Sequence, residues 1–281
     1  MNEIKKIFGR QILDSRGNPT VEVEIILNNG IKSRASVPSG ASTGEHEAIE
    51  KRDNDNSKYL GKGVSKVINN INFEINNNLQ GLLPFDQEKI DQKLIELDGT
   101  KNKSRLGANA LLGVSLAISR VSAKAKNESL YKYLSHNKDF VLPTPLMNFI
   151  NGGAHANNSL DFQEIMIMPV GAKSFSEALR WGAEIFHHLK KILSDKLYST
   201  SVGDEGGFSP QIKSVDEALE LLSKAVENSG RNLENEIKFA IDAAASEFFS
   251  NNYYQMHNGE KKLDTSDMIN MWENLVQKYP I

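Results

Sequence analysis

The sequence predicts an α/β protein in which an N-terminal α+β domain precedes an incomplete (β/α) barrel. Residues 20–37 alternate apolar and polar side chains as paired strands do, helical periodicity follows up to residue 125, and strands alternate with helices after Pro145. The second region offers about 140 residues, whereas a complete barrel takes roughly 250. We therefore expect the chain to be a fragment, or to be completed by something else.

Composition indicates a globular protein with enough residues for two domains. Of 281 residues, 39% are hydrophobic and 25% are charged, and acids and bases are interspersed with a net charge of −3, so nothing favours binding to nucleic acid. The chain has no cysteine, which excludes disulfides and thiolate metal ligands. It has no run of the ~18 apolar residues that a membrane span needs, and its N-terminus lacks an apolar signal segment, so we expect a cytoplasmic protein.

The N-terminal α+β domain is expected at residues 1–138. Asn29-Gly30 favours a type I′ hairpin turn because both residues tolerate positive φ. Asp86 and Gly99 have the positions of a helix N-cap and of a glycine just past a helix end. The expected elements are strands at residues 7–13, 20–27 and 31–37, and helices that begin at Glu45, that follow Asp86, and that span residues 104–125.

Residues 38–44 combine small side chains with two glycines and three hydroxyls. Such a segment suits a mobile lid that closes on an anion or on a hydrated cation. On composition alone, however, a flexible linker into the following helix is the better interpretation.

The second domain is expected at residues 139–281. A short apolar strand at 146–150 leads into a glycine-rich loop at 151–158, where His155 can donate to a phosphate or a carboxylate. An ordinary glycine-rich turn with an exposed imidazole fits these residues equally well. Further expected elements are helices that follow Ser174 and Ser214, a strand at residues 237–242 and a last helix at residues 266–278.

A strand expected at residues 161–168 carries Gln163 and Glu164 within an apolar run. Buried polar groups cost free energy unless they are paired, so these two side chains indicate partners, a ligand or an edge position. Adjacent strand residues point to opposite faces, and both can line one cavity only with a bulge or a twist. A half-exposed strand is the alternative.

Two further stretches place acids beside glycines or at a strand end. Asp204 and Glu205 lie between glycines in residues 202–208, a backbone that can bend tightly and approach a ligand closely. Taken alone, a solvated acidic turn is the better interpretation of that loop. Asp242 ends the strand at 237–242, where barrels carry functional groups, although it would serve equally well as a turn cap.

Six stretches occur in one order along the chain, at residues 14–23, 39–44, 97–100, 107–110, 151–156 and 202–208. Together they resemble the enolase family, and the match runs in register through the whole chain. The resemblance implies an enolase-type barrel as the second domain. It also implies an enzyme, a lyase that catalyses the Mg²⁺-dependent, reversible dehydration of 2-phosphoglycerate to phosphoenolpyruvate in glycolysis.

The resemblance assigns six residues to this chemistry. It implies proton donation to the leaving hydroxyl by Glu205, support of that acid by Glu164, substrate contacts from His155 and Gln163, and ligation of two Mg²⁺ ions in which Asp242 and Ser42 take part. The family's other metal carboxylates and its lysine base would lie beyond Ile281. The family also implies a homo-oligomer, a dimer or an octamer, for the full-length protein.

Two other functions fit the same residues. One is a non-catalytic role in surface binding or as a scaffold, with a secondary pool of the protein at the cell surface or secreted. The other is a lyase of the same superfamily that acts on a different carboxylate. The segments around Ser42 and Glu205 argue against the second alternative because they match the parts that are specific for phosphoglycerate.

Overall fold

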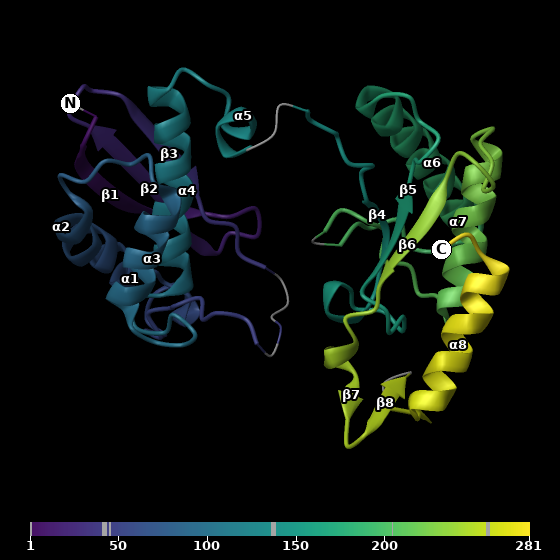
Figure 1. Ribbon diagram of the computed structural model, residues 1–281. Coiled ribbons are helices and arrows are strands. Elements are labelled where there is room, and N and C mark those ends of the chain that lie inside the picture. Colours follow the sequence, from purple (N-terminus) through teal and green to yellow (C-terminus); the bar gives the residue numbers. More distant parts are fainter. Residues whose placement is uncertain (1, 41–43, 45, 136–138, 204, 257–258) are drawn as a thin grey trace. The chain divides into compact units, whose positions relative to one another are not determined.

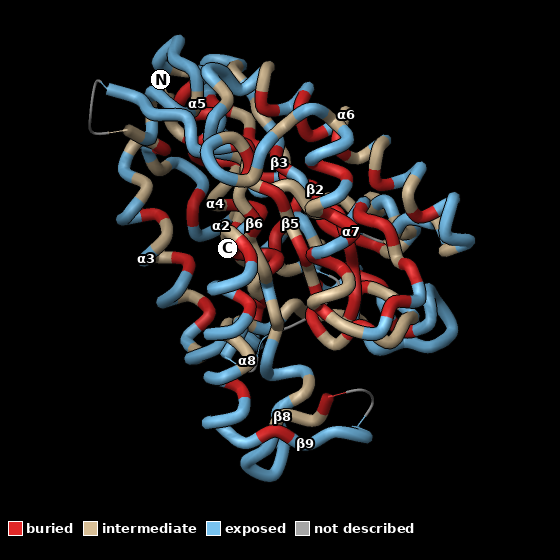
Figure 2. Tube along the Cα trace, turned by 90° about the vertical axis from the view of Figure 1, so that its right-hand side faces the viewer, coloured by how far each residue is buried: buried red, intermediate tan, exposed pale blue. Residues whose placement is uncertain are grey.

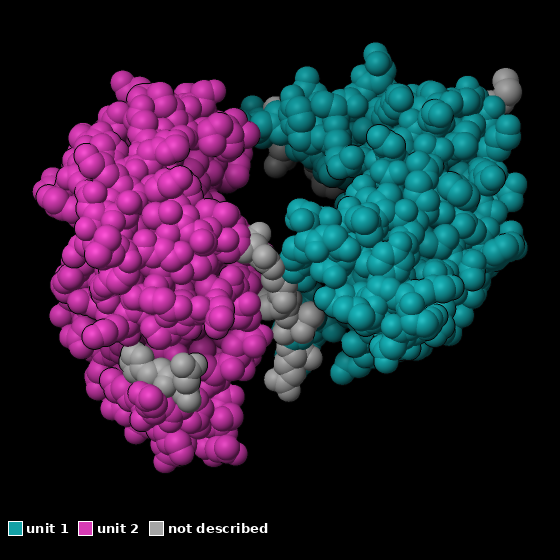
Figure 3. All heavy atoms as spheres, turned by 180° about the vertical axis from the view of Figure 1, so that it is seen from behind, with its two compact units in different colours: residues 1–140 teal, residues 141–281 magenta. Residues whose placement is uncertain are grey.

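The computed structural model describes residues 2–40, 44, 46–135, 139–203, 205–256 and 259–281. The chain divides into two compact units, Met1–Phe140 and Val141–Ile281, which Figure 3 shows in different colours. Each unit has its own hydrophobic core. The predicted domain boundary between residues 138 and 139 remains a prediction.

Unit 1 contains an antiparallel meander, as the alternating sequence predicts. Strands β1 (Ile4–Leu13), β2 (Pro19–Leu27) and β3 (Lys32–Ser36) pair in the order β1-β2-β3. The predicted hairpin joins β2 to β3, with Gly30 at a φ of +84° and its amide donating to the Leu27 carbonyl at 2.9 Å. The predicted type I′ turn is wrong, because, of its two predicted central residues, Gly30 has a positive φ and Asn29 does not. The buried side chains of β2 face the helices of this unit.

The helices of unit 1 pack on one face of this meander (Figure 1). Asp86 caps the helix that begins at Gln87 by accepting from the Lys89 amide at 3.1 Å. Gly99 ends the same helix in the left-handed conformation, so both predicted signals are confirmed. The helices are α1 (Ser65–Asn69), the π-helical turn Asn70–Ile75, α2 (Asn76–Leu79), α3 (Gln87–Asp98), α4 (Ala108–Ala125) and α5 (Leu130–Leu134), with a short 3₁₀ turn at Tyr59–Gly61.

A helix was expected to begin at Glu45, and this prediction is wrong for the described residues that follow Glu45. Residues 47–50 have no helical structure, because their backbone pairs with a distant segment. The Ile49 amide donates to the Asn102 carbonyl, and the Ala108 amide donates to the Ile49 carbonyl, both at 2.8 Å. These tertiary hydrogen bonds outweigh the local helical propensity of the acidic stretch.

Unit 2 is built on strands β4 (Met147–Asn151), β5 (Glu164–Met168) and β6 (Lys238–Asp242), in the order β4-β5-β6. Both pairings are antiparallel. Phe208 makes a parallel bridge to Ile150 on the other side of β4. Because β5 runs opposite to its neighbours, its first residue lies beside the last residues of β4 and β6.

Helices α6 (Phe175–Asp195), α7 (Val215–Asn228) and α8 (Thr265–Lys278) lie along one side of this sheet in Figure 1, and their apolar faces join its core. In Figure 2 the buried positions gather on the strands and on the helix sides that face them. Ser174 and Ser214 cap α6 and α7, as their spacing predicts. None of the helices that the structure describes has the length and hydrophobicity that a membrane crossing requires.

A small antiparallel sheet in unit 2 was not predicted. It consists of β7 (Phe249–Ser250), β8 (Tyr253–Met256) and β9 (Lys261–Leu263), and a 3₁₀ turn at Ala245–Glu247 precedes it. Strands this short carry too few residues for a readable alternation of apolar and polar side chains.

Candidate functional site

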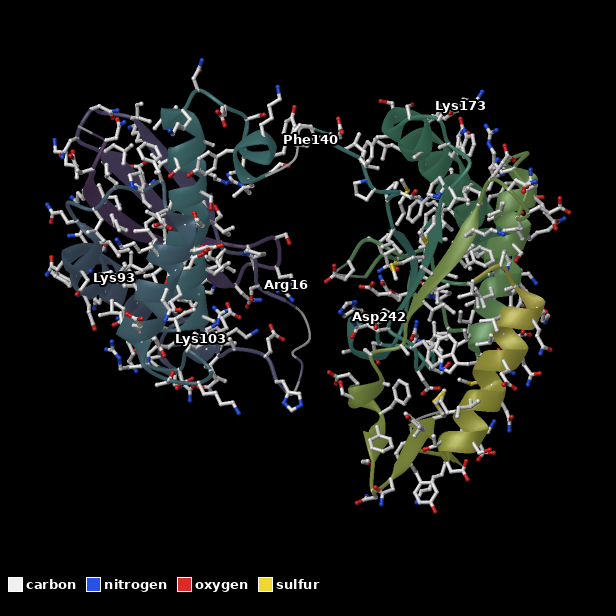
Figure 4. All side chains as sticks on the ribbon, viewed as in Figure 1. Arg16, Lys93, Lys103, Phe140, Lys173 and Asp242 are labelled. Carbon is white, nitrogen blue, oxygen red and sulfur yellow. The ribbon has the colours of Figure 1, made fainter. Side chains whose placement is uncertain are left out.

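Three residues form a row across one end of the sheet of unit 2. Asn151 pairs with Glu164, and Glu164 pairs with Asp242, each directly across the ladder. Directly opposed residues of antiparallel strands have Cβ atoms about 5 Å apart and project to the same side. The carboxylates of Glu164 and Asp242 therefore share one face of the sheet at one end, and Figure 4 labels Asp242 at the tip of β6.

That face is the one opposite the helices. Ile165 and Ile167 point into the core and are fully buried, whereas Glu164, Met166 and Met168 alternate with them and are half-buried. The alternation along β5 therefore separates a packing face from a face that carries acids.

A glycine-rich turn brings His155 onto the start of β5. The Gly152 amide donates to the Gln163 carbonyl at 3.0 Å, and an ideal Cβ on Gly152 would lie 2.5 Å from the carbonyl oxygens of Leu160 and Phe162. Only glycine permits this close approach. The turn places Nδ1 of His155 3.4 Å from Oε1 of Glu164, a distance suited to an ion pair when the imidazole is protonated.

Two polar atoms, one of them the His155 nitrogen of this contact, are buried without hydrogen bonds. Among the residues that the structure describes, Nδ1 of His155 and Oε1 of Gln163 have no hydrogen-bond partner. Most buried polar groups in folded proteins are paired, so an unpaired one indicates a place where a ligand or a water completes the site.

Several charged groups at this end of the sheet change the pKa of Glu164. Burial raises the pKa of its carboxyl, the negative charges of Asp242 and Glu205 raise it further, and only His155 opposes them. Acids from two other segments therefore act on Glu164 at this end of the sheet. Such a concentration of negative charge favours the binding of a cation.

The segment that joins Val202 to Phe208 and carries Glu205, here called the Glu205 loop, is a tight backbone turn. The Gly203 amide donates to the Gly207 carbonyl at 2.8 Å, and the Gly206 amide donates to the Gly203 carbonyl at 3.0 Å. Gly206 has a φ of +86°, which favours glycine. Phe208 anchors the loop in the core, and the Glu205 side chain is exposed at the turn. The predicted tight bend is confirmed.

Two family models match this chain, one after the other. The model described as "Enolase, N-terminal domain" covers residues 4–134, and the one described as "Enolase, C-terminal TIM barrel domain" covers residues 139–281. The chain belongs to the enolase family. It is 52% identical over 280 residues to "Enolase 2" of Pseudomonas syringae pv. syringae, and equally so to "Enolase 2" of Pseudomonas syringae pv. tomato.

The alignment covers 99% of this chain and 66% of each of those two relatives. The expected resemblance to enolase and the expected fold class, an α+β domain followed by an incomplete enolase-type barrel, are confirmed. Membership of the enolase family implies a divalent metal.

The structure brings together most of the residues that the enolase resemblance assigned. Glu164 and Asp242 are register partners, Glu205 acts electrostatically on Glu164, and His155 contacts Glu164. Ser42 lies outside the described residues. The strand expected from residue 161 begins at Glu164, so Gln163 precedes the ladder and strand alternation does not fix its side chain.

The acids suit part of a metal site. Mg²⁺ prefers oxygen donors, and the carboxylates of this row supply them. Within the described part of the chain, no three acids or histidines lie close enough together to enclose an ion. Asp242 also accepts from the Ala244 amide at 2.9 Å, so the turn-capping alternative and a ligand role are compatible.

One residue of the row was missed from the sequence. Asn151 is fully buried, and its side chain donates to the Gly207 carbonyl in the Glu205 loop. The signal that would have revealed it is an amide residue directly after an apolar strand and directly before two glycines, a position that a solvated turn residue would also occupy.

Proposed function

We propose that this enolase-family protein catalyses the Mg²⁺-dependent, reversible dehydration of 2-phosphoglycerate to phosphoenolpyruvate in glycolysis. The observation that best supports this proposal is the joint action of Asp242 and Glu205 on Glu164, beside the His155 contact. Acids that gather from three segments cost stability unless a ligand uses them.

The reaction needs fixed positive charge. Removal of a proton next to a carboxylate builds a dianionic intermediate, which a bound Mg²⁺ stabilises by its charge. The enolase superfamily is itself a standard example of a Lys or His base that works with one or two Mg²⁺ ions. In this chain Asp242 would hold one ion, and Ser42, on the segment before the first helices, is proposed as a ligand of a second.

The other side chains bind substrate and move protons. Hydroxide is a poor leaving group, so an acid must donate a proton to it, and we assign that donation to Glu205. The charges of Glu205 and Asp242 both raise the pKa of Glu164, and we assign to Glu164 the support of the acid Glu205. His155 and Gln163 are assigned to substrate contacts, and Oε1 of Gln163, which has no hydrogen-bond partner among the described residues, supplies hydrogen-bonding capacity for one of them.

The proposed activity is that of the whole protein. The chain spans 66% of the length of its two curated relatives, and the assigned residues include no lysine base. We place the full-length enzyme in the cytoplasm as a homo-oligomer, a dimer or an octamer, with a secondary pool at the cell surface or secreted.

Replacement of the proposed acid tests this function. With Mg²⁺ and 2-phosphoglycerate added to the full-length protein, formation of the enol product is followed by its ultraviolet absorbance. Glu205→Gln should lower kcat at least about 100-fold, because general acid catalysis contributes that much or more. The control is Glu234→Gln, which removes an exposed acid from a turn elsewhere in unit 2 and should leave the rate unchanged. An undiminished rate in Glu205→Gln would overturn the assignment.

A further inference from the structure

We propose that Asn151 is a positioning residue that holds the Glu205 loop against the row of acids. This inference rests on the function proposed above and adds to it a residue that does not touch the substrate. It follows from the place of Asn151 in the sheet, from its hydrogen bonds and from the space that the loop leaves for it.

Asn151 stands between the acids and the loop. It is the last residue of β4, its register partner is Glu164, and on its other side its amide donates to the Phe208 carbonyl at 2.8 Å. The row Asp242, Glu164 and Asn151 therefore continues directly into the backbone that carries Glu205. A shift of Asn151 changes the position of the loop relative to Glu164.

The side chain of Asn151 uses both halves of its amide. It is fully buried, its Nδ2 donates to the Gly207 carbonyl at 2.9 Å, and its Oδ1 accepts from Nδ2 of Asn148. An aspartate would place an acceptor against the Gly207 carbonyl, and a leucine would remove one of the two donors to that carbonyl, the other being the Gly203 amide. Among side chains of this size, only an amide supplies one donor and one acceptor together.

The loop backbone fits tightly around this side chain. An ideal Cβ on Gly203 would lie 2.6 Å from Nδ2 of Asn151, and one on Gly207 would lie 2.9 Å from the carbonyl carbon of Phe149. The glycines on both sides of Glu205 thus leave room for β4 and for Asn151. The Gly207 contact is made by backbone on both elements, and the Gly203 contact meets the buried Asn151 side chain, which leaves little freedom for rotamer adjustment.

Asn158 secures the other end of the same arrangement. Its Nδ2 donates to the Asn151 carbonyl at 2.8 Å and to the Pro210 carbonyl at 3.0 Å, so it joins the end of β4 to the segment that follows the loop. Its Oδ1 accepts from the Leu160 amide at 3.2 Å. Asn158 is half-buried, so its replacement perturbs the core less than replacement of Asn151.

Because Glu205 is exposed, the loop backbone is what directs its side chain. A catalytic group that is displaced by about 1 Å can lose roughly 100-fold in rate without any loss of substrate affinity. Removal of the Asn151 donor is therefore expected to lower kcat while KM stays nearly constant. A residue that only stabilised the fold would lower the fraction of folded protein and would not loosen this loop selectively.

Hydrogen exchange of individual amides in Asn151→Asp and Asn158→Ala tests the proposal without any substrate. Loss of a buried hydrogen bond should speed exchange of the Gly203, Gly206 and Phe208 amides by about 10-fold. Amides within α7 should exchange at the wild-type rate. Asn158→Ala keeps the test decisive if Asn151→Asp does not fold.

The matched control is Asn109→Asp in unit 1. Asn109 is also buried and also pairs with backbone, accepting from the Lys51 amide at 3.2 Å and donating to the Lys51 carbonyl at 3.1 Å. It should leave exchange in the Glu205 loop unchanged. Unchanged exchange in both test variants, or equal acceleration throughout unit 2, would overturn the positioning role.

A kinetic measurement separates this proposal from the proposed function. With Mg²⁺ and 2-phosphoglycerate, the Asn151→Asp protein should show a kcat lowered by about 10-fold or more and a KM within about twofold of the wild type. Faster loop exchange with an unchanged kcat would also contradict the positioning role. If the full-length wild-type protein shows no turnover, the proposed function fails, and hydrogen exchange alone still decides the role of Asn151.

Discussion

Asp98 in unit 1 and Glu164 in unit 2 are both carboxylates withdrawn from solvent, yet their pKa values shift in opposite directions. At Asp98, burial raises the pKa, but hydrogen bonds from the Thr100 hydroxyl, the Leu106 amide and the Thr100 amide outweigh burial and lower it. At Glu164, burial and two neighbouring acids raise the pKa, and only His155 opposes them.

This difference shows how structural and functional acids can be distinguished. Asp98 accepts from the Leu106 amide at 2.7 Å and from the Thr100 amide at 3.0 Å, so the fold itself satisfies the charge. Glu164 has no comparable set of donors among the residues described around it, and its charge adds to that of two other acids. A satisfied carboxylate stabilises the fold, whereas a crowded one indicates a site for a cation or a proton.

The largest expected effect is on the stability of unit 1. Asp98→Asn should lower its free energy of unfolding by about 3 kcal/mol, because the amide loses charge-assisted hydrogen bonds and can place a donor against the Leu106 amide. Denaturant unfolding of the variant and of the wild type measures this difference. A loss within about 0.5 kcal/mol, the range of a neutral surface change, would remove the contrast between the two acids.

The pH dependence of the same contribution has a definite sign. The pKa of Asp98 is lowered in the folded state from its ordinary value of 3.8, so the folded protein binds that proton less tightly than the unfolded chain. The stabilisation that ionised Asp98 gives the folded protein is complete above pH 3.8 and is lost as the pH falls through the pKa of Asp98 in the folded state. Unfolding curves at a series of acidic pH values should therefore show a smaller dependence in Asp98→Asn than in the wild type.

A smaller loss is expected for Gly203→Ala in unit 2. The new Cβ would lie 2.6 Å from Nδ2 of Asn151 and 2.9 Å from the His155 carbonyl, so the loop must shift. Overpacking of this kind costs about 1–3 kcal/mol. Thermal unfolding measures the loss, with Gly44→Ala as the control, because Gly44 like Gly203 has no positive φ but an added Cβ there meets no atom within 4 Å. A loss in Gly203→Ala no greater than that in Gly44→Ala would show that the loop does not pack against Asn151.

The smallest expected effect has the opposite sign. Glu164→Gln should raise the free energy of unfolding of unit 2 by up to about 1 kcal/mol at neutral pH, because it removes a partly buried charge beside two other acids. The same substitution should lower the proposed dehydration rate. If Glu164→Gln instead destabilised the protein as Asp98→Asn does, Glu164 would belong with the structural acids.

Much of the fold could be predicted because its signals are local. The hairpin with a left-handed Gly30 and the Asp86 cap depend on neighbours within a few residues, and both occur as expected, although the turn is not of the predicted type I′. The helix expected at Glu45 failed because the Ile49 backbone pairs with Asn102, a partner far away in the sequence. Local propensity does not contain such tertiary pairings.

The candidate site was predictable as a set of residue types but not as an arrangement. Asp242 is visible as an acid at a strand end, Glu205 as an acid between glycines and Glu164 as an acid within an apolar run, and the enolase resemblance assigned their roles. The direction of β5, which places its first residue beside the last residue of β6, depends on pairing between distant segments. The role of Asn151 depends on a hydrogen bond to Gly207, 56 residues further on, and no local pattern reports it.

The most direct measurement is an NMR titration of the Glu164 carboxyl in the wild type, in Asp242→Asn and in Glu205→Gln. If the three acids form one site, the pKa of Glu164 in the wild type lies above its ordinary value of 4.5 and falls in each variant, because each substitution removes a charge that raises it. A pKa of Glu164 at the ordinary value that neither substitution changes would contradict the site.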